Sequence, residues 1–113
     1  MLQRVLAALT RTEGVEQAML LDERGRLLAC VGEEGKSPRI DAAIEATNMA
    51  TELCSALELG NLYEIWCEGD ERMMIDIAHP SRIVVLTGTG GRLARWRHAL
   101  DRNRKIIATT PQM

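Results

Sequence analysis

The chain has 113 residues, of which 46% are hydrophobic and 27% charged, and it carries a formal net charge of −2. These values are ordinary for one globular domain with a core of its own. Aromatic residues make up only 3% and phenylalanine is absent, which argues against an aromatic-lined cofactor pocket or a base-stacking platform.

The first predicted elements are a short helix and a hairpin. Leu2, Val5, Leu6 and Leu9 recur at helical spacing, which predicts an amphipathic helix with a narrow apolar stripe. Two apolar runs, residues 17–21 and 26–31, follow and are joined by an Asp-x-x-Gly turn. Asp22 and Gly25 hold the positions where a side-chain acceptor and a left-handed residue stabilise a turn.

The next stretch, CVGEEGKSPRI at residues 30–40, contains Gly-Lys-Ser after an apolar run and before a helical pattern. A phosphate-binding loop needs a glycine where Cys30 stands, and Glu33 and Glu34 would repel a polyphosphate. We therefore predict no nucleotide binding and a polar loop in which Ser37 caps a helix that Pro38 opens.

A long helix is predicted over residues 39–59 and is expected to end at Gly60. Its sheet-facing side is expected to hold Ala43, Ala46, Ala50, Leu53, Cys54 and Leu57. Ile40, Ile44, Thr47 and Thr51 extend the apolar surface on one flank, and Met49 and Ala56 extend it on the other. The arc without charge spans roughly 240°, against roughly 100° for a helix with one buried side. Either the loop at residues 32–38 covers this surface, or a second subunit does, and we favour the second subunit.

Three strands and a last helix complete the predicted order, which is helix, two strands, helix, three strands, helix. The strands are expected at residues 62–68, 72–78 and 82–87, and the helix at 91–104, with 106–113 as a tail. The runs at 19–21 and 83–86 are apolar on both faces, which is typical of central strands. Glu64 and Glu68 point to one face of the strand at 62–68, and such charges are common on edge strands.

Six basic residues and a single acid, Asp101, occupy residues 89–113, whereas residues 1–88 hold 8 basic and 15 acidic residues. Trp96 and Leu100 are predicted to be buried, with the arginines forming a solvated helix face. Such a run could bind nucleic acid or an acidic membrane surface. We expect it instead to dock an acidic protein, because basic runs alone are weak indicators of nucleic-acid binding.

Catalytic and metal sites are not expected. His79 and His98 lack a serine, cysteine or acid at triad spacing, and Asp76 is expected to make a structural hydrogen bond. Cys30, Cys54 and Cys67 lie far apart with no histidine nearby, so we predict buried free thiols and no metal site or other cofactor. Without a signal-peptide pattern or a membrane-length apolar run, we expect a cytoplasmic protein with no membrane insertion.

The order of elements, with Gly14-Val15 before the first strand and AMLLDERGRLLA as the first hairpin, resembles the roadblock family of small α/β domains. That family includes dynein light-chain roadblock proteins, lysosomal scaffolds that hold GTPases, and bacterial gliding-motility regulators of a small Ras-like GTPase. The resemblance covers nearly the whole chain, and we expect one domain at residues 1–113. It implies an α/β (α+β) fold with a single five-stranded antiparallel sheet, the long middle helix on one face and the terminal helices on the other.

The resemblance also implies a dimer formed by edge-to-edge pairing of the third strands and side-by-side packing of the long helices. The expected interface residues are Ile40, Ile44, Thr47, Met49, Thr51, Tyr63 and Trp66. The expected function is that of a non-enzymatic regulator or scaffold of a small Ras-like GTPase, contacted through Asp41, Glu45, Asn48 and Glu52. The alternative is a GTPase-independent adaptor or sensor domain that binds another protein or a small ligand. Homodimer and heterodimer stay open, as do activation, inhibition and passive scaffolding.

Overall fold

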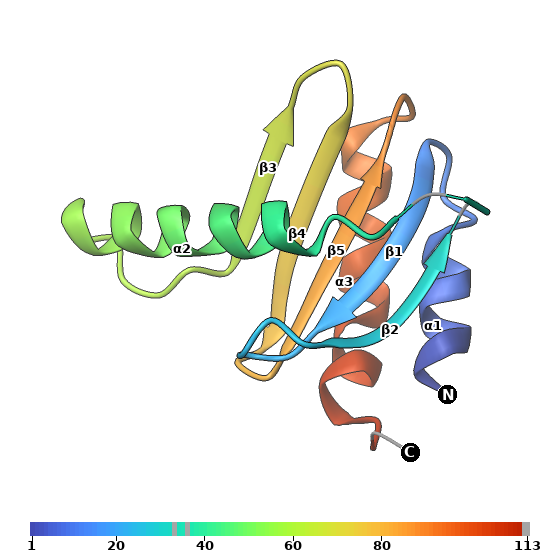
Figure 1. Cartoon of the computed structure of the whole chain (residues 1–113), viewed down its shortest axis with the longest axis horizontal. Helices are drawn as coiled ribbons and strands as arrows, with labels where there is room; N and C mark the ends of the chain where they lie inside the picture. The colour runs from blue at the N-terminus through green and yellow to red at the C-terminus, as the bar shows by residue number, and fades with distance from the viewer. Residues whose placement is uncertain (33, 36, 112–113) are drawn as a thin grey trace.

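The computed structural model describes residues 1–32, 34–35 and 37–111. The elements are α1 (Leu2–Leu9), β1 (Val15–Leu21), β2 (Leu27–Gly32), α2 (Ile40–Ala56), β3 (Glu64–Glu68), β4 (Arg72–His79), β5 (Arg82–Gly88) and α3 (Leu93–Thr109). The strands form one antiparallel sheet in the order β2-β1-β5-β4-β3. Helix α2 crosses one face of this sheet, and α1 and α3 cover the other (Figure 1). The predicted fold class and element order are confirmed.

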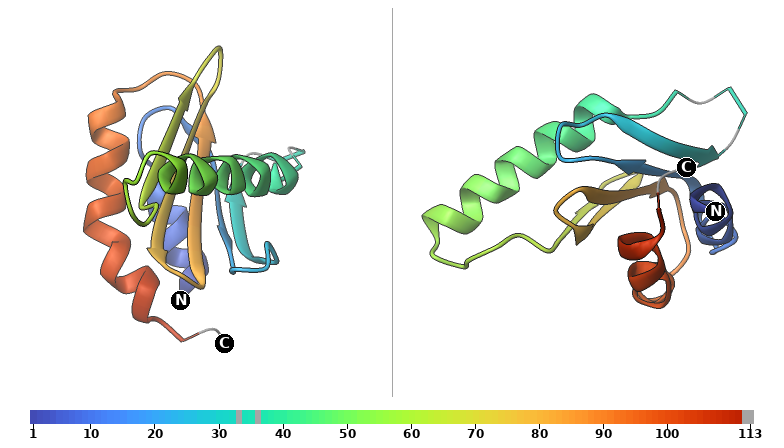
Figure 2. Two further views of the ribbon diagram at one scale, coloured as in Figure 1. Left: turned by 90° about the vertical axis from the view of Figure 1, so that its left-hand side faces the viewer. Right: turned by 90° about the horizontal axis from the view of Figure 1, so that it is seen from below.

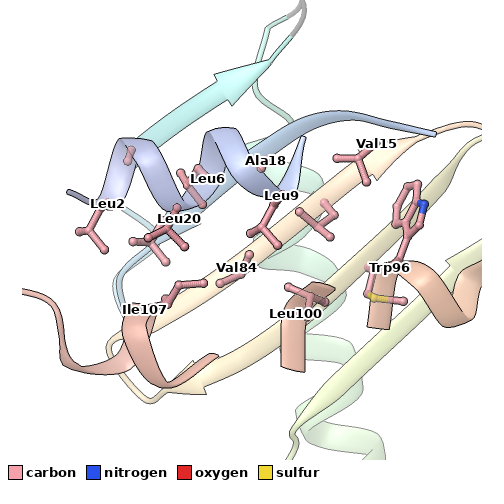
Figure 3. Close-up of a cluster of buried hydrophobic side chains, with 14 residues drawn as sticks. Leu2, Leu6, Leu9, Val15, Ala18, Leu20, Val84, Trp96, Leu100 and Ile107 are labelled. Carbon is pink, nitrogen blue, oxygen red and sulfur yellow. The ribbon is translucent and has the colours of Figure 1, made fainter. Parts of the chain in front are cut away.

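The main core lies between the sheet and the layer formed by α1 and α3. Leu2, Leu6 and Leu9 of α1 and Trp96, Leu100 and Ile107 of α3 meet Ala18, Leu20 and Val84 of the sheet (Figure 3). Trp96 and Leu9 are fully buried, so the predicted core role of Trp96 is confirmed. Its indole N–H also donates to the carbonyl of Glu13 at 2.9 Å, which satisfies the ring's one polar group.

The α2 face of the sheet has a much smaller core. Its buried members are Met19, Leu21, Ala43, Ile75 and Val85, and Ala43 is the one buried residue that α2 contributes. Because a methyl group removes little apolar area from water, this packing stabilises α2 far less than α3 is stabilised on the opposite face. β5 and β1 lie inside the sheet, as their apolar runs predicted.

The ends of α2 differ from the prediction. Ser37 does not cap the helix, because α2 begins at Ile40 with Arg39 as its N-terminal boundary residue and has no side-chain capping bond. The helix ends at Ala56, four residues before Gly60, with Glu58 in the left-handed region at φ 56°. The N–H of Leu59 bonds the carbonyl of Cys54, and the N–H of Glu58 bonds that of Ser55. This pair of bonds is a Schellman motif.

Helix α3 is longer than predicted and ends at Thr109 rather than near residue 104. Ile107 is completely buried in the α1–α3 core, and its carbonyl accepts a hydrogen bond from Arg82 at 2.8 Å. The predicted tail at residues 106–113 therefore begins later, because the core apolar stripe continues one turn beyond the cluster of arginines.

The β1–β2 turn matches its prediction. The N–H groups of Arg24 and Arg26 both donate to Oδ1 of Asp22 at 2.9 Å, and Gly25 has φ 78°. The bond from the N–H of Arg26 lowers the pKa of Asp22 most, those from Arg24 and the Arg26 side chain add to it, and burial acts in the opposite direction. A β-carbon on Gly25 would collide with the side chain of Ile44.

Arg72 joins the start of β4 to the glycine-rich loop before α3. It is buried and pairs with Glu68 at 2.6 Å, donates to the carbonyls of Gly90 and Gly91 at 3.2 Å, and lies over the ring of Trp96. The glycine-rich piece is therefore a turn, as the sequence indicated. Lys36 of the Gly-Lys-Ser motif lies outside the described residues.

Two further findings concern the cysteines and the membrane. All three cysteines are free, but Cys67 is exposed and Cys30 and Cys54 are half-buried, so the prediction of buried thiols was wrong. Burial raises the pKa of the Cys30 thiol.

Among the described residues, every helix is too short or too polar to span a lipid bilayer.

Candidate interaction surface

Helix α2 extends past the edge of the sheet. It crosses the strands at a steep angle, and its C-terminal half lies beyond β3 (Figures 1 and 2). Met49, Leu53 and Leu57 are 63%, 57% and 58% exposed. The sequence placed Leu53 and Leu57 against the sheet, and this was wrong because the sheet ends at β3 before the helix does.

The two flanks of α2 differ in their surroundings. Ile40 packs on the α2-side core, and Ile44 contacts the β1–β2 turn at Gly25. Thr47 and Thr51 lie on this same flank, and their hydroxyls donate to carbonyls one turn earlier at 2.8 and 2.7 Å. Four of the expected interface residues thus face the turns of the same chain, although Thr51 stays exposed.

The opposite flank holds the larger unpartnered apolar surface. At 100° per residue, Ala42, Ala46, Met49 and Leu53 share this flank. Ala42 and Ala46 line a shallow groove with Cys67 of β3 and Met73 of β4. Met49 is therefore an expected interface residue that the structure leaves largely exposed, and Leu53 is an exposed residue that the sequence analysis had placed against the sheet.

β3 forms the sheet edge beside this flank, as its charge pattern predicted. Tyr63 and Trp66 are 69% and 46% exposed. The two glutamates already have arginine partners in the same chain: Glu64 pairs with Arg97 at 3.3 Å and Glu68 with Arg72 at 2.6 Å. Arg97 also lies over the ring of Trp66. Both carboxylates lie on the α3 side, so their charge is compensated at the edge.

The outward surface of α2 is acidic. Asp41, Glu45, Asn48 and Glu52 are all exposed, and α2 contains no lysine or arginine from Ile40 to Ala56. No positive charge on α2 itself therefore compensates these carboxylates. The structure brings the four expected partner-binding residues together on one open strip.

A wide groove lies below the C-terminal half of α2, with a volume of about 1080 Å³. Thr51, Ser55 and Glu58 of α2 line it together with Tyr63 and His79. These five side chains are exposed to solvent, so the groove is an open surface feature and not an enclosed ligand cavity.

The other candidate residues have structural surroundings. Asp76 is 2% exposed and accepts two bonds from Arg104 at 2.7 and 3.0 Å, which confirms its expected structural role and raises the pKa of Arg104. His79 is exposed and bonds Ser81 at 2.8 Å. Within the described residues, no three His, Cys, Asp or Glu side chains gather as a metal site would require.

The arrangement of α2, the sheet and the two terminal helices is the one that the resemblance to the roadblock family implied. No protein-family model matches the sequence, and no curated protein matches it either. Solved structures do match. Gliding protein MglB from Thermus thermophilus superposes with a TM-score of 0.77 at 23% identity, over 93% of this chain and 84% of that one.

Two further structures show the same likeness. A structure described as MglB with tetrameric arrangement matches with a TM-score of 0.76 at 23% identity, over 93% of this chain and 83% of that one. A roadblock/LC7 domain from Streptomyces avermitilis matches with a TM-score of 0.73 at 15% identity, over 93% and 92% of the two chains. The resemblance drawn from the sequence is confirmed at the level of the fold.

Proposed function

We propose that this chain is a non-enzymatic regulatory domain that forms a homodimer through α2 and β3 and binds a small Ras-like GTPase in the cytoplasm. The observation that carries the proposal is the C-terminal half of α2, whose apolar flank extends beyond the sheet. The structural likeness to MglB supports both parts, and one similar MglB structure is described as tetrameric.

The dimer follows from the position of the uncovered surface. Met49 and Leu53 are exposed, and the C-terminal half of α2 extends beyond the open edge of β3 (Figure 1). A two-fold axis at that edge would therefore place each exposed helix half over the partner's sheet. The two surfaces would then cover each other, as an isologous interface requires. The compensated glutamates of β3 remove the charge repulsion that would oppose strand pairing.

The GTPase would bind the acidic strip on the outside of the paired helices. Asp41, Glu45, Asn48 and Glu52 remain exposed when the apolar flank is covered, because they point away from the sheet. Helix α3, which carries the cluster of arginines, lies on the opposite face of the sheet from α2 (Figure 2). Since an arginine finger must project into the partner's active site, this arrangement favours binding and remodelling of the switch loops over direct supply of a catalytic arginine.

Charge reversal tests the partner surface. Glu45→Lys and Glu52→Lys should weaken binding to the proposed small Ras-like GTPase and should change the salt dependence of that binding. Asp70→Lys is the matched control, because Asp70 is an exposed acid in the β3–β4 turn. Calorimetric titration in which all three variants bind like the wild type would contradict the assignment.

Substitution of arginines tests the mechanism. Changing Arg92, Arg95 or Arg97 to alanine should leave any stimulated GTP hydrolysis within a few-fold of the wild type. A loss of roughly a thousand-fold from one of these changes is the behaviour of an arginine finger. Such a loss in single-turnover hydrolysis would move the active surface to α3.

A further inference from the structure

The outer surface of the α1–α3 layer carries six exposed cations that have no side-chain partner among the described residues. Four of them come from the α3 region: Arg92 directly before the helix, and Arg95, Arg102 and Lys105 within it. The other two are Arg4 of α1 and Arg11 in the turn after α1. None takes part in an ion pair or a side-chain hydrogen bond within the described part of the chain. The two from the first helix were not part of the basic cluster seen in the sequence.

The arginines of α3 divide between two flanks. Arg97 and Arg104 reach toward β3 and β4, where they pair with Glu64 and Asp76. Arg95 and Arg102 are seven residues apart, which places them together on the other flank at 100° per residue. Ala99, between them, packs against the main core. The unpaired arginines of α3 therefore lie on the side of α3 that faces α1.

Helices α1 and α3 run antiparallel and side by side, so their cations share one surface. The core shows this order: Leu2 and Ile107 lie at one end of the layer, and Leu9 and Leu100 lie further along it (Figure 3). Because Leu2, Leu6 and Leu9 face inward, the exposed side chain of Arg4 faces outward. Arg4 and Arg102 thus extend the same positively charged surface.

Few acids oppose this charge, and apolar atoms accompany it. Asp101 of α3 is already paired with Arg104 at 2.8 Å. Met1 and Ile106 are 72% and 46% exposed, and each directly neighbours Leu2 or Ile107 at the end of the layer where the two helices meet. The surface therefore combines unpaired guanidinium groups with exposed aliphatic groups at one end.

We propose that this α1–α3 surface binds the anionic headgroups of a phospholipid bilayer peripherally, without any element that spans the bilayer. Basic surface residues are attracted to anionic lipids additively, and exposed aliphatic groups enter the interfacial region. The surface is formed by two adjacent helices, and none of its unpaired cations lines one of the grooves of the described residues. These cations therefore lie on an open surface, as contact with a flat bilayer requires.

A lipid surface fits these features better than nucleic acid or a folded protein does. Two packed helices, each about 10 Å across, cannot enter a major groove about 12 Å wide together, and Trp96 is buried and cannot stack on bases. Tight protein interfaces centre on aromatic anchors in pockets, and within the described residues none of these unpaired cations makes a cation–π contact.

Membrane binding would orient the domain. In the dimer of the proposed function, the two α1–α3 surfaces would lie on the same side of a continuous sheet, and both acidic α2 surfaces would lie on the opposite side. That orientation rests on the proposed function, but lipid binding by the single chain does not. A vesicle assay without any GTPase therefore tests the lipid surface separately.

The test is flotation of the purified chain with lipid vesicles. The wild type should float with vesicles of equimolar phosphatidylcholine and phosphatidylglycerol, should not float with phosphatidylcholine alone, and should be released as salt shortens the Debye length. Each cation near an anionic surface contributes about fivefold to partitioning. Arg95→Glu and Arg102→Glu should each lower the partition coefficient roughly 25-fold, since a reversal removes one attraction and adds one repulsion.

Arg24→Glu is the matched control, because Arg24 is an exposed arginine in the β1–β2 turn and its reversal changes the net charge equally. This variant should partition within about twofold of the wild type, and Arg95→Lys with Arg102→Lys should retain binding. Circular dichroism melting confirms folding of each variant. The proposal fails if the wild type stays unbound at low salt, if Arg24→Glu lowers partitioning as much as Arg95→Glu, or if duplex DNA binds more tightly than the vesicles and depends on the same arginines.

Discussion

Leu53 provides the sharpest test of the proposed dimer, because it is exposed in the single chain and would be covered by the partner. Full burial of a leucine side chain is worth about 1.5–3 kcal/mol. Since 57% of Leu53 is exposed in the single chain, covering it would contribute about 1–2 kcal/mol per copy. A two-fold axis doubles this to about 2–4 kcal/mol. We therefore expect Leu53→Ala to raise the dimer dissociation constant roughly 30- to 700-fold.

Sedimentation equilibrium measures this dissociation constant directly. Leu27→Ala is the control, because Leu27 is 40% exposed but lies on β2 at the opposite edge of the sheet. Both variants should keep the unfolding free energy of the single chain within about 0.5 kcal/mol, since neither residue belongs to its core. A wild type that is monomeric at micromolar concentration would refute the reasoning, as would dissociation caused by Leu27→Ala and not by Leu53→Ala.

Three further predictions concern stability. Arg72→Lys should lower the unfolding free energy by about 2 kcal/mol in urea titration, because a lysine cannot serve Glu68 and two loop carbonyls together; an unchanged midpoint would contradict the role of Arg72. The pKa of Asp22 is lowered by folding, so its stabilising effect is present above the unfolded pKa and is lost as pH falls through the folded value. Asp22→Asn should therefore be less stable than the wild type at neutral pH, with a difference that shrinks below about pH 4; a pH-independent difference would rule out the linkage. Glu58→Gly should stabilise the chain by about 1 kcal/mol, because Glu58 holds a left-handed conformation that glycine adopts without strain; Glu58→Ala, which keeps the strain, should show no such gain in thermal melts.

The main features of the fold were predictable because their signals are local. The apolar runs of β1 and β5 are continuous since both faces of these strands are buried, and this pattern identified them as interior strands. The Asp22 turn was identified because its hydrogen bonds lie within five residues of sequence. The edge position of β3 followed from Glu64 and Glu68, although their partners Arg97 and Arg72 could not be inferred from spacing.

The placement of α2 relative to the sheet was not predictable from periodicity. A helical pattern shows that Leu53 and Leu57 share a side with Ala43, but it does not show where the sheet beneath them ends. The width of the apolar arc gave the only warning, since it exceeded what one sheet face can cover. The grouping of Arg4 with the arginines of α3 was missed for a similar reason, because the two helices are adjacent in space and far apart in sequence.

The two faces of the sheet differ in how far each depends on a partner. The α1–α3 layer buries Trp96, Leu100 and Ile107 along with the leucines of α1, so its position is secured by the chain itself and its exposed side chains can vary without loss of the core. Helix α2 buries Ala43 alone, so the chain by itself holds its C-terminal half weakly. An interface on α2 would therefore add to the folding stability of the domain, whereas a ligand on the α1–α3 surface would bind a structure that is already complete.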